Sequence, residues 1–195
     1  MIYLVGGAPR AGKTLLGQRV AAKLKIGWMS TDILEYMLRV SQVAGQKTEW
    51  NADPEAISDG ARWFYPYLDQ FIFGIRSSAE SYLIDGVDFL PEQVAKLSAR
   101  YPIRAVFMGC SQMTLERLDR FPGRSKGYAG LPDDLRQRIA QDVPLWSEFI
   151  RQEAIHSGYP YVDTGGNFEA SLAEAEALLI NPLDFLSLPP TEERE

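Results

Sequence analysis

Cysteine and histidine are scarce in this chain of 195 residues, which contains one of each, Cys110 and His156. One cysteine excludes a disulfide within the chain and is compatible with a reducing compartment. We interpret Cys110 as a small buried residue at the end of a strand. One histidine excludes a histidine-rich metal site, and its place near the end of a predicted helix, where a cation is favoured, explains it.

Long apolar runs and basic blocks are also missing. No stretch approaches the roughly 20 apolar residues that span a bilayer, and the chain starts with a strand pattern, so we expect neither a membrane segment nor a signal peptide. The net charge is −6 and no block of lysine and arginine stands out. This disfavours a nucleic-acid partner, whose phosphates require a basic surface. We therefore expect a cytoplasmic protein of ordinary globular composition, with its oligomeric state left open.

A phosphate-binding pattern lies near the start of the chain. An apolar run at residues 2–5 is followed by glycine, four residues, glycine, lysine and threonine, and then by a helical pattern. The glycines permit a tight turn whose backbone N–H groups point at phosphate oxygens, and the helix adds its N-terminal positive charge. Strand, turn and helix in this order distinguish a nucleotide-binding loop from an ordinary glycine-rich turn. We predict nucleotide binding by Gly7, Ala8, Pro9, Arg10, Ala11, Gly12, Lys13, Thr14 and Leu15.

Individual side chains in and near this loop have predicted roles. Lys13 can reach the β- and γ-phosphates, and the hydroxyl of Thr14 can ligate Mg²⁺. Asp85 closes an apolar run and suits the role of holding the same Mg²⁺ through water, with a turn or helix cap as the alternative. Asp88, three residues on, belongs to the same group of charges and is a candidate substrate-binding residue.

Apolar runs predict five strands, at residues 2–6, 26–29, 82–87, 103–108 and 159–162. Helical patterns are expected at about 13–25, 33–43, 54–81, 91–100, 111–119, 133–156 and 168–179, and residues 42–53 are expected to form a surface loop. This alternation predicts a parallel α/β sheet with its ligands beyond the carboxyl ends of the strands. We expect a kink or break at Pro66 and an interruption near Pro144.

The segment 54–81 is rich in aromatic residues, concentrated at positions 61–73. These rings either pack on the body of the domain or wall a substrate pocket, and the sequence leaves both interpretations open.

Asp32 follows the second predicted strand and so lies at the same edge of the sheet as the phosphate loop. An ionised aspartate can orient an attacking hydroxyl and accept its proton, so we predict that Asp32 is catalytic and binds the acceptor. Arg39, seven residues on along the same helix, is predicted to bind an anionic part of the substrate. The alternative for Asp32 is a helix cap.

A basic cluster is formed by Arg117, Arg120 and Arg124 with Lys126: the first two share a helix face at i, i+3, and the others follow in a glycine-bearing loop. Phosphoryl transfer needs mobile cations that neutralise the transferring group. We therefore predict a lid at about 117–131 in which these three arginines are catalytic; a solvated charged loop is the alternative. With the lid, we expect one domain over residues 1–182 and a loose tail over 183–195.

Together, these motifs resemble those of the P-loop small-molecule kinases related to nucleoside monophosphate kinases, over most of residues 1–180. The resemblance lies in the Walker A motif at 7–14, the substrate-binding segment at 30–39, the Walker B strand and turn at 83–86 and the start of the lid at 115–120. It implies a three-layer P-loop NTPase fold with a five-stranded parallel sheet in the order 2-3-1-4-5. It also implies ATP and Mg²⁺ as cofactors, a small-molecule substrate, and a loop at 164–166 near the adenine.

Within this group the motifs are most similar to 2-phosphoglycerate-kinase-like and zeta-toxin-like kinases. Adenylate kinases have an arginine shortly after the Asp-Gly turn, where this chain has Asp88-Phe89-Leu90, which argues against a nucleotide acceptor. Glu35 stands where phosphoglycerate-type kinases often have a basic residue, which counts against a phosphorylated acid.

The sequence therefore predicts an ATP-dependent kinase that acts on a hydroxyl of a small metabolite. The alternatives are a nucleoside monophosphate kinase and a non-catalytic ATP-binding switch protein. The motif Asn-Lys-x-Asp of guanine-specific switches is absent from the sequence, which counts against a GTPase.

Overall fold

The structure, a computed structural model, describes residues 1–40, 52–78, 80–120 and 128–181. The strands in these parts of the chain are β1 (Ile2–Gly7), β2 (Gly27–Ser30), β3 (Tyr82–Asp85), β4 (Ile103–Gly109) and β5 (Tyr161–Asp163). They form one five-stranded sheet in the order β2-β3-β1-β4-β5, and every pair of neighbours is parallel. The predicted fold class and strand order are confirmed.

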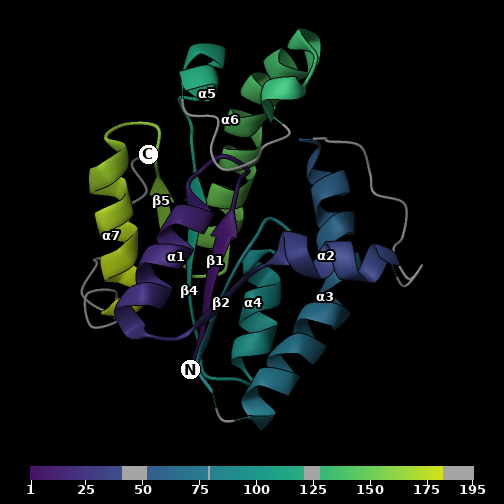
Figure 1. Cartoon of the computed structure of the whole chain (residues 1–195), viewed down its shortest axis with the longest axis vertical. Coiled ribbons are helices and arrows are strands. Elements are labelled where there is room, and N and C mark those ends of the chain that lie inside the picture. Colours follow the sequence, from purple (N-terminus) through teal and green to yellow (C-terminus); the bar gives the residue numbers. More distant parts are fainter. Residues whose placement is uncertain (41–51, 79, 121–127, 182–195) are drawn as a thin grey trace, which may run out of the picture.

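Helices cover both faces of this sheet. Their bounds are α1 (Lys13–Leu24), α2 (Thr31–Val40), α3 (Pro54–Ser77), α4 (Pro91–Ser98), α5 (Leu115–Arg120), α6 (Asp133–His156) and α7 (Phe168–Ile180), with a 3₁₀ turn η1 (Tyr128–Gly130). α1 and α7 pack on one face, and α3, α4 and α6 pack on the other (Figure 1). None of the helices in the described parts of the chain has the length and hydropathy needed to cross a membrane.

The central strand β1 shows why the strands are apolar without alternation. Leu4 points into the core beneath α3, α4 and α6, and Val5 into the core beneath α1 and α7, and both are fully buried. A strand with both faces covered needs apolar residues at every position. The register then places Ser30 and Val5 opposite Asp85 on its two neighbouring strands. The carboxyl ends of β2, β3 and β1 therefore meet at one edge.

Neither proline in the middle of a helix interrupts it. α3 continues through Pro66 and α6 through Pro144, so the predicted interruption near Pro144 and the break considered at Pro66 are wrong. A proline removes one backbone hydrogen bond and crowds the preceding turn. However, residues close to each proline, on either side of it, are fully buried. They are Phe64 and Leu68 around Pro66, and Val143 and Ser147 around Pro144. Packing along the buried face of each helix therefore outweighs the local cost of the proline.

Other boundaries shift by a few residues. The helix expected from residue 111 begins at Leu115, β3 ends at Asp85 rather than at 87, and β5 begins at Tyr161 rather than at 159. Most of the predicted loop at 42–53, the middle of the predicted lid and the predicted tail lie outside the described residues.

The continuity of α3 at Pro66 gives a stability prediction. The Pro66 side chain is exposed, so alanine at this position restores a helical hydrogen bond and loses no packing. Alanine is favoured over proline inside a helix by about 3 kcal/mol, of which up to about 1 kcal/mol is offset by the more flexible unfolded chain. We expect Pro66→Ala to raise the free energy of unfolding by about 2 kcal/mol, measured by urea denaturation.

The control is Gln70→Ala, at another exposed position of the same helix, which should change the free energy of unfolding by less than about 0.5 kcal/mol. Unchanged or reduced stability of Pro66→Ala would contradict a continuous helix at this position.

Candidate active site

The turn between β1 and α1 is fixed by its glycines and by β4. Gly7 has a φ of 129° and Gly12 a φ of 90°, values that favour glycine. A Cβ atom at Gly7 would lie 2.0 Å from the carbonyl oxygen of Met108. The N–H of Ala8 donates to that same oxygen over 2.8 Å. The geometry of the turn therefore requires glycine at its start, and the turn leads directly into the N-terminus of α1, where phosphate binding is favoured.

Lys13 is the first residue of α1, and its side chain closes the loop. Its Nζ donates to the carbonyl oxygen of Ala8 over 2.6 Å, and the residue is only 7% exposed. Burial lowers the pKa of Lys13 to about 8, and the charges of Asp85, Asp32 and Asp88 oppose part of this shift. The lysine and the three predicted carboxylates therefore act on one another at the same edge of the sheet.

The carboxylate of Asp85 is 1% exposed and accepts two hydrogen bonds. Thr14 Oγ1 donates to Oδ2 over 2.8 Å, and the indole Nε1 of Trp28 donates to Oδ1 over 2.6 Å. Burial raises the pKa of Asp85, against the hydrogen bonds and the charge of Lys13. Hydroxyl and carboxylate oxygens are the ligands that Mg²⁺ prefers. Because the two predicted metal ligands are in direct contact, Thr14 and Asp85 could hold Mg²⁺ beside the phosphate loop.

Asp88 is tied to the start of α2. Its Oδ2 accepts a hydrogen bond from the hydroxyl of Thr31, which is fully buried. A Cβ atom at Gly86 would lie 1.9 Å from the Thr31 Oγ1 atom, so the glycine makes room for this contact. Burial, together with the charges of Glu35 and Asp32, raises the pKa of Asp88 to about 6, against the hydrogen bond from Thr31. Asp32 itself is exposed, in the first turn of α2.

Arg117 holds the loop that follows β5. Its guanidinium group donates to the carbonyl oxygen of Thr164 over 2.6 Å and to that of Gly165. Thr164 is in turn fixed to the end of β4, since its N–H and its hydroxyl both donate to the carbonyl oxygen of Gly109. α5 and the loop at 164–166 are therefore joined through one side chain. These contacts use two of the five N–H donors of the arginine, so the group can still donate to a phosphate.

Three other predicted site residues are located less fully. Arg120 is exposed at the C-terminal end of α5. Arg39 lies in α2, but its side chain is outside the described residues, and so is the whole of Arg124. The roles of these three arginines stay predictions.

The structure adds a contact between the phosphate loop and the predicted lid. The guanidinium group of Arg10 lies 4.7 Å from the ring centroid of Tyr128, in η1. Tyr128 is 1% exposed, and its hydroxyl donates to Asp119 over 3.3 Å. Asp119 also accepts a hydrogen bond from Arg136, in α6, over 2.7 Å. Sequence reasoning gave Arg10 only a backbone role, and no motif indicated its ring partner.

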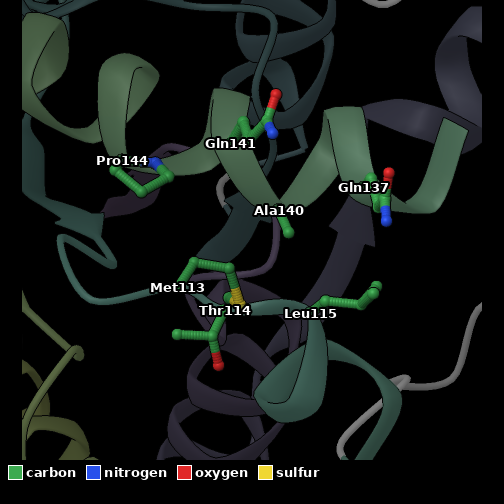
Figure 2. Close-up of a pocket in the computed structure, with 7 residues that line it drawn as sticks. All are labelled: Met113, Thr114, Leu115, Gln137, Ala140, Gln141 and Pro144. Carbon is green, nitrogen blue, oxygen red and sulfur yellow. The ribbon is translucent and has the colours of Figure 1, made fainter. Parts of the chain in front are cut away.

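A cavity of about 400 Å³ lies between the segment before α5 and one face of α6 (Figure 2). It is lined by Met113, Thr114, Leu115, Gln137, Ala140, Gln141 and Pro144. This lining contains no ionisable side chain and none of the predicted site residues. Because the ionisable groups gather instead around Lys13 and Asp85, we place the candidate active site there.

No family model and no curated protein matches this chain. Among solved structures, a sugar kinase from Janibacter is 14% identical with a TM-score of 0.55, and the alignment covers 96% of this chain and 98% of that one. A shikimate kinase from Bacteroides thetaiotaomicron is 17% identical with a TM-score of 0.50, over 91% of this chain and 97% of that one. At these identities the likeness shows the fold alone, a P-loop kinase-like α/β fold. The alignments cover nearly the whole length of both chains.

The raised pKa of Asp88 predicts a pH-dependent stability. The pKa of the Asp88 carboxyl group is about 6 in the folded protein and 3.8 in the unfolded chain, so the folded protein stays protonated up to a higher pH. The free energy of unfolding therefore decreases as the pH rises from about 4 to about 6. Asp88→Asn removes the charge and keeps an oxygen that accepts from Thr31. The variant should therefore gain stability over the wild type through this range, and the gain should level off at higher pH.

We expect the total gain to be about 1–3 kcal/mol, since one pKa unit corresponds to about 1.4 kcal/mol. Urea denaturation of both proteins at a series of pH values measures it. A difference in stability that stays constant across this range would contradict the raised pKa of Asp88.

Proposed function

We propose that this protein is an ATP-dependent phosphotransferase that transfers a phosphoryl group, with Mg²⁺, to a hydroxyl of a small metabolite. One observation carries the proposal: Lys13 at the mouth of the phosphate loop lies next to the hydrogen-bonded pair of Thr14 and Asp85. The shared fold of a sugar kinase and a shikimate kinase supports a small-molecule acceptor.

The donor side of the proposed site binds and neutralises the triphosphate. In the proposal, the phosphates are bound by backbone N–H groups of the turn other than that of Ala8, which donates to Met108, and by the N-terminus of α1. The Lys13 ammonium, released from the carbonyl oxygen of Ala8, supplies a positive charge to the β- and γ-phosphates. Thr14 and Asp85 are the residues that would hold Mg²⁺, which neutralises charge on the transferring group.

The acceptor side is built on the start of α2. Asp32 is exposed there, and its charge acts on Lys13, which supports a role for its carboxylate beside the transferred phosphoryl group. In the proposed mechanism it orients the attacking hydroxyl and accepts its proton. Asp88, held by Thr31, and Arg39 are proposed to bind other parts of the acceptor.

Arginines of the lid complete the proposed site. Arg117, Arg120 and Arg124 supply positive charge to the phosphoryl group during transfer, where such charges lower the barrier most. The contacts of Arg117 with the carbonyl oxygens of Thr164 and Gly165 support a second role, since they hold the loop expected near the adenine.

Lys13→Met tests the donor side. The change removes the ammonium group and keeps a long apolar side chain. The lowered pKa of Lys13 indicates that its charge is costly to bury in the free protein, so the fold should survive the loss of that charge. Removing one charge that stabilises a transition state typically costs about 10²–10³-fold in rate. We expect transfer to fall at least that much, measured by transfer of label from ATP, while the melting temperature is kept.

The matched control is Lys96→Met, an exposed lysine of α4 paired with Glu92, which should leave transfer unchanged. Wild-type turnover by Lys13→Met would refute the proposed function.

Asp32→Asn tests the acceptor side. The amide keeps the size of the side chain in the first turn of α2, but it cannot accept the proton of the attacking hydroxyl. We expect the melting temperature and the affinity for ATP to stay close to those of the wild type, and transfer to a pool of hydroxylated metabolites to be lost.

Glu35→Gln, one turn further along α2, removes one negative charge without removing the proposed base, and it should retain most of the transfer activity. If Asp32→Asn melted earlier but turned over normally, the role of Asp32 would be structural.

A further inference from the structure

Trp28 contacts the candidate active site although it belongs to no phosphate-binding motif. It lies in β2, next to β3, and its indole Nε1 donates to Asp85 Oδ1 over 2.6 Å. Thr14, from the phosphate loop, donates to the other oxygen, Oδ2, over 2.8 Å. Each oxygen of the carboxylate therefore has its own donor, and the two donors come from different elements. A carboxylate held in this way cannot rotate without breaking a hydrogen bond in a buried site.

α1 carries a glycine where the indole lies against it. Gly17 is an interior residue of this helix, a position at which glycine is less favourable than alanine. A Cβ atom at Gly17 would lie 2.9 Å from the Nε1 atom of Trp28 and 2.9 Å from Leu83 Cδ2. The glycine therefore leaves space for the nitrogen that donates to Asp85. This is a second observation that ties the placement of the indole N–H to the local sequence.

We propose that Trp28 is a positioning residue for the carboxylate of Asp85. Its N–H holds Oδ1, so that Oδ2 faces the Thr14 hydroxyl at the side where Mg²⁺ would be held. The inference rests on the proposed function and adds to it a residue that acts through Asp85. A donor in the outer shell of a metal site orients the ligand, and its loss typically lowers metal affinity or activity by about 10–100-fold.

The alternative is that Trp28 only packs, since part of it contacts the core beneath α1 and α7. Phenylalanine would serve that purpose nearly as well, because it fills much of the same space with an apolar ring. The two roles therefore differ in the N–H alone, and Trp28→Phe separates them.

The experiment is isothermal titration calorimetry of ATP binding with and without Mg²⁺. In the wild type, Mg²⁺ should strengthen ATP binding, and the gain is the ratio of the two dissociation constants. We expect Trp28→Phe to lower this gain by about tenfold or more, with little change in the affinity for ATP measured without Mg²⁺. Trp63→Phe, a partly buried tryptophan of α3 on the other face of the sheet, is the control and should keep the full gain.

Gly17→Ala is a second variant that leaves the indole in place but crowds its nitrogen. It should also lower the gain from Mg²⁺, although alanine favours the helix. In the Trp28→Phe background the nitrogen is gone, so Gly17→Ala should lower the gain from Mg²⁺ much less than it does in the wild type. Non-additivity of this kind is expected if both changes act through the indole nitrogen of Trp28.

A full gain from Mg²⁺ in Trp28→Phe would overturn the inference and leave the proposed function standing. A wild type that gains nothing from Mg²⁺ would overturn the proposed function, and with it the role of Trp28.

Discussion

A carboxylate charge that is almost completely removed from water is the constraint around which this site is arranged. An isolated buried charge is very costly unless hydrogen bonds and opposite charges compensate it. Asp85 is 1% exposed, and its compensation comes from Thr14 at the start of α1, from Trp28 in β2 and from the charge of Lys13. Parallel pairing of β2, β3 and β1 is what brings these groups to one place. The charge, the phosphate loop and the sheet edge are therefore fixed together.

Asp85, at the end of β3, and Asp88, in the turn that follows, lie in different environments. The charges of Lys13 and Asp32 act on both, but Asp85 has a donor for each oxygen, whereas Asp88 has one hydroxyl donor and a further acidic neighbour, Glu35. The first arrangement suits a fixed anion that could hold the proposed Mg²⁺. The second raises the pKa of the Asp88 carboxyl group to about 6, beside the place proposed for the acceptor. Neighbouring acids with different environments are a common way to divide roles within one site.

Arg10 and Arg117 connect the phosphate loop and the predicted lid to the rest of the site. Arg10 stacks on the buried ring of Tyr128, and Arg117 joins α5 to the loop after β5. Both contacts lie at the ends of the segment at 121–127, which is outside the described residues.

The sequence predicted the parts of this site that depend on local chain geometry. Glycine at positions 7 and 12, the lysine and threonine that follow, and an acid closing an apolar strand are read from spacing, because strand, turn and helix fix where these side chains point. Trp28 and Tyr128 could not be found in this way, since their partners are 57 and 118 residues away. The break at Pro66 was predicted from the hydrogen bond that a proline removes from a helix. It does not occur, because α3 is stabilised by packing against residues that are distant in the sequence.

The central claim is that this edge of the sheet moves a phosphoryl group from ATP to a small hydroxylated molecule. The most direct measurement supplies ATP labelled in its γ-phosphate, Mg²⁺ and a pool of hydroxylated metabolites, and follows the label by mass spectrometry. The account predicts that the label appears in one class of metabolite, as an added phosphoryl group. Label that stays in bound ATP, or that appears only as inorganic phosphate, would contradict it and indicate a nucleotide-binding switch.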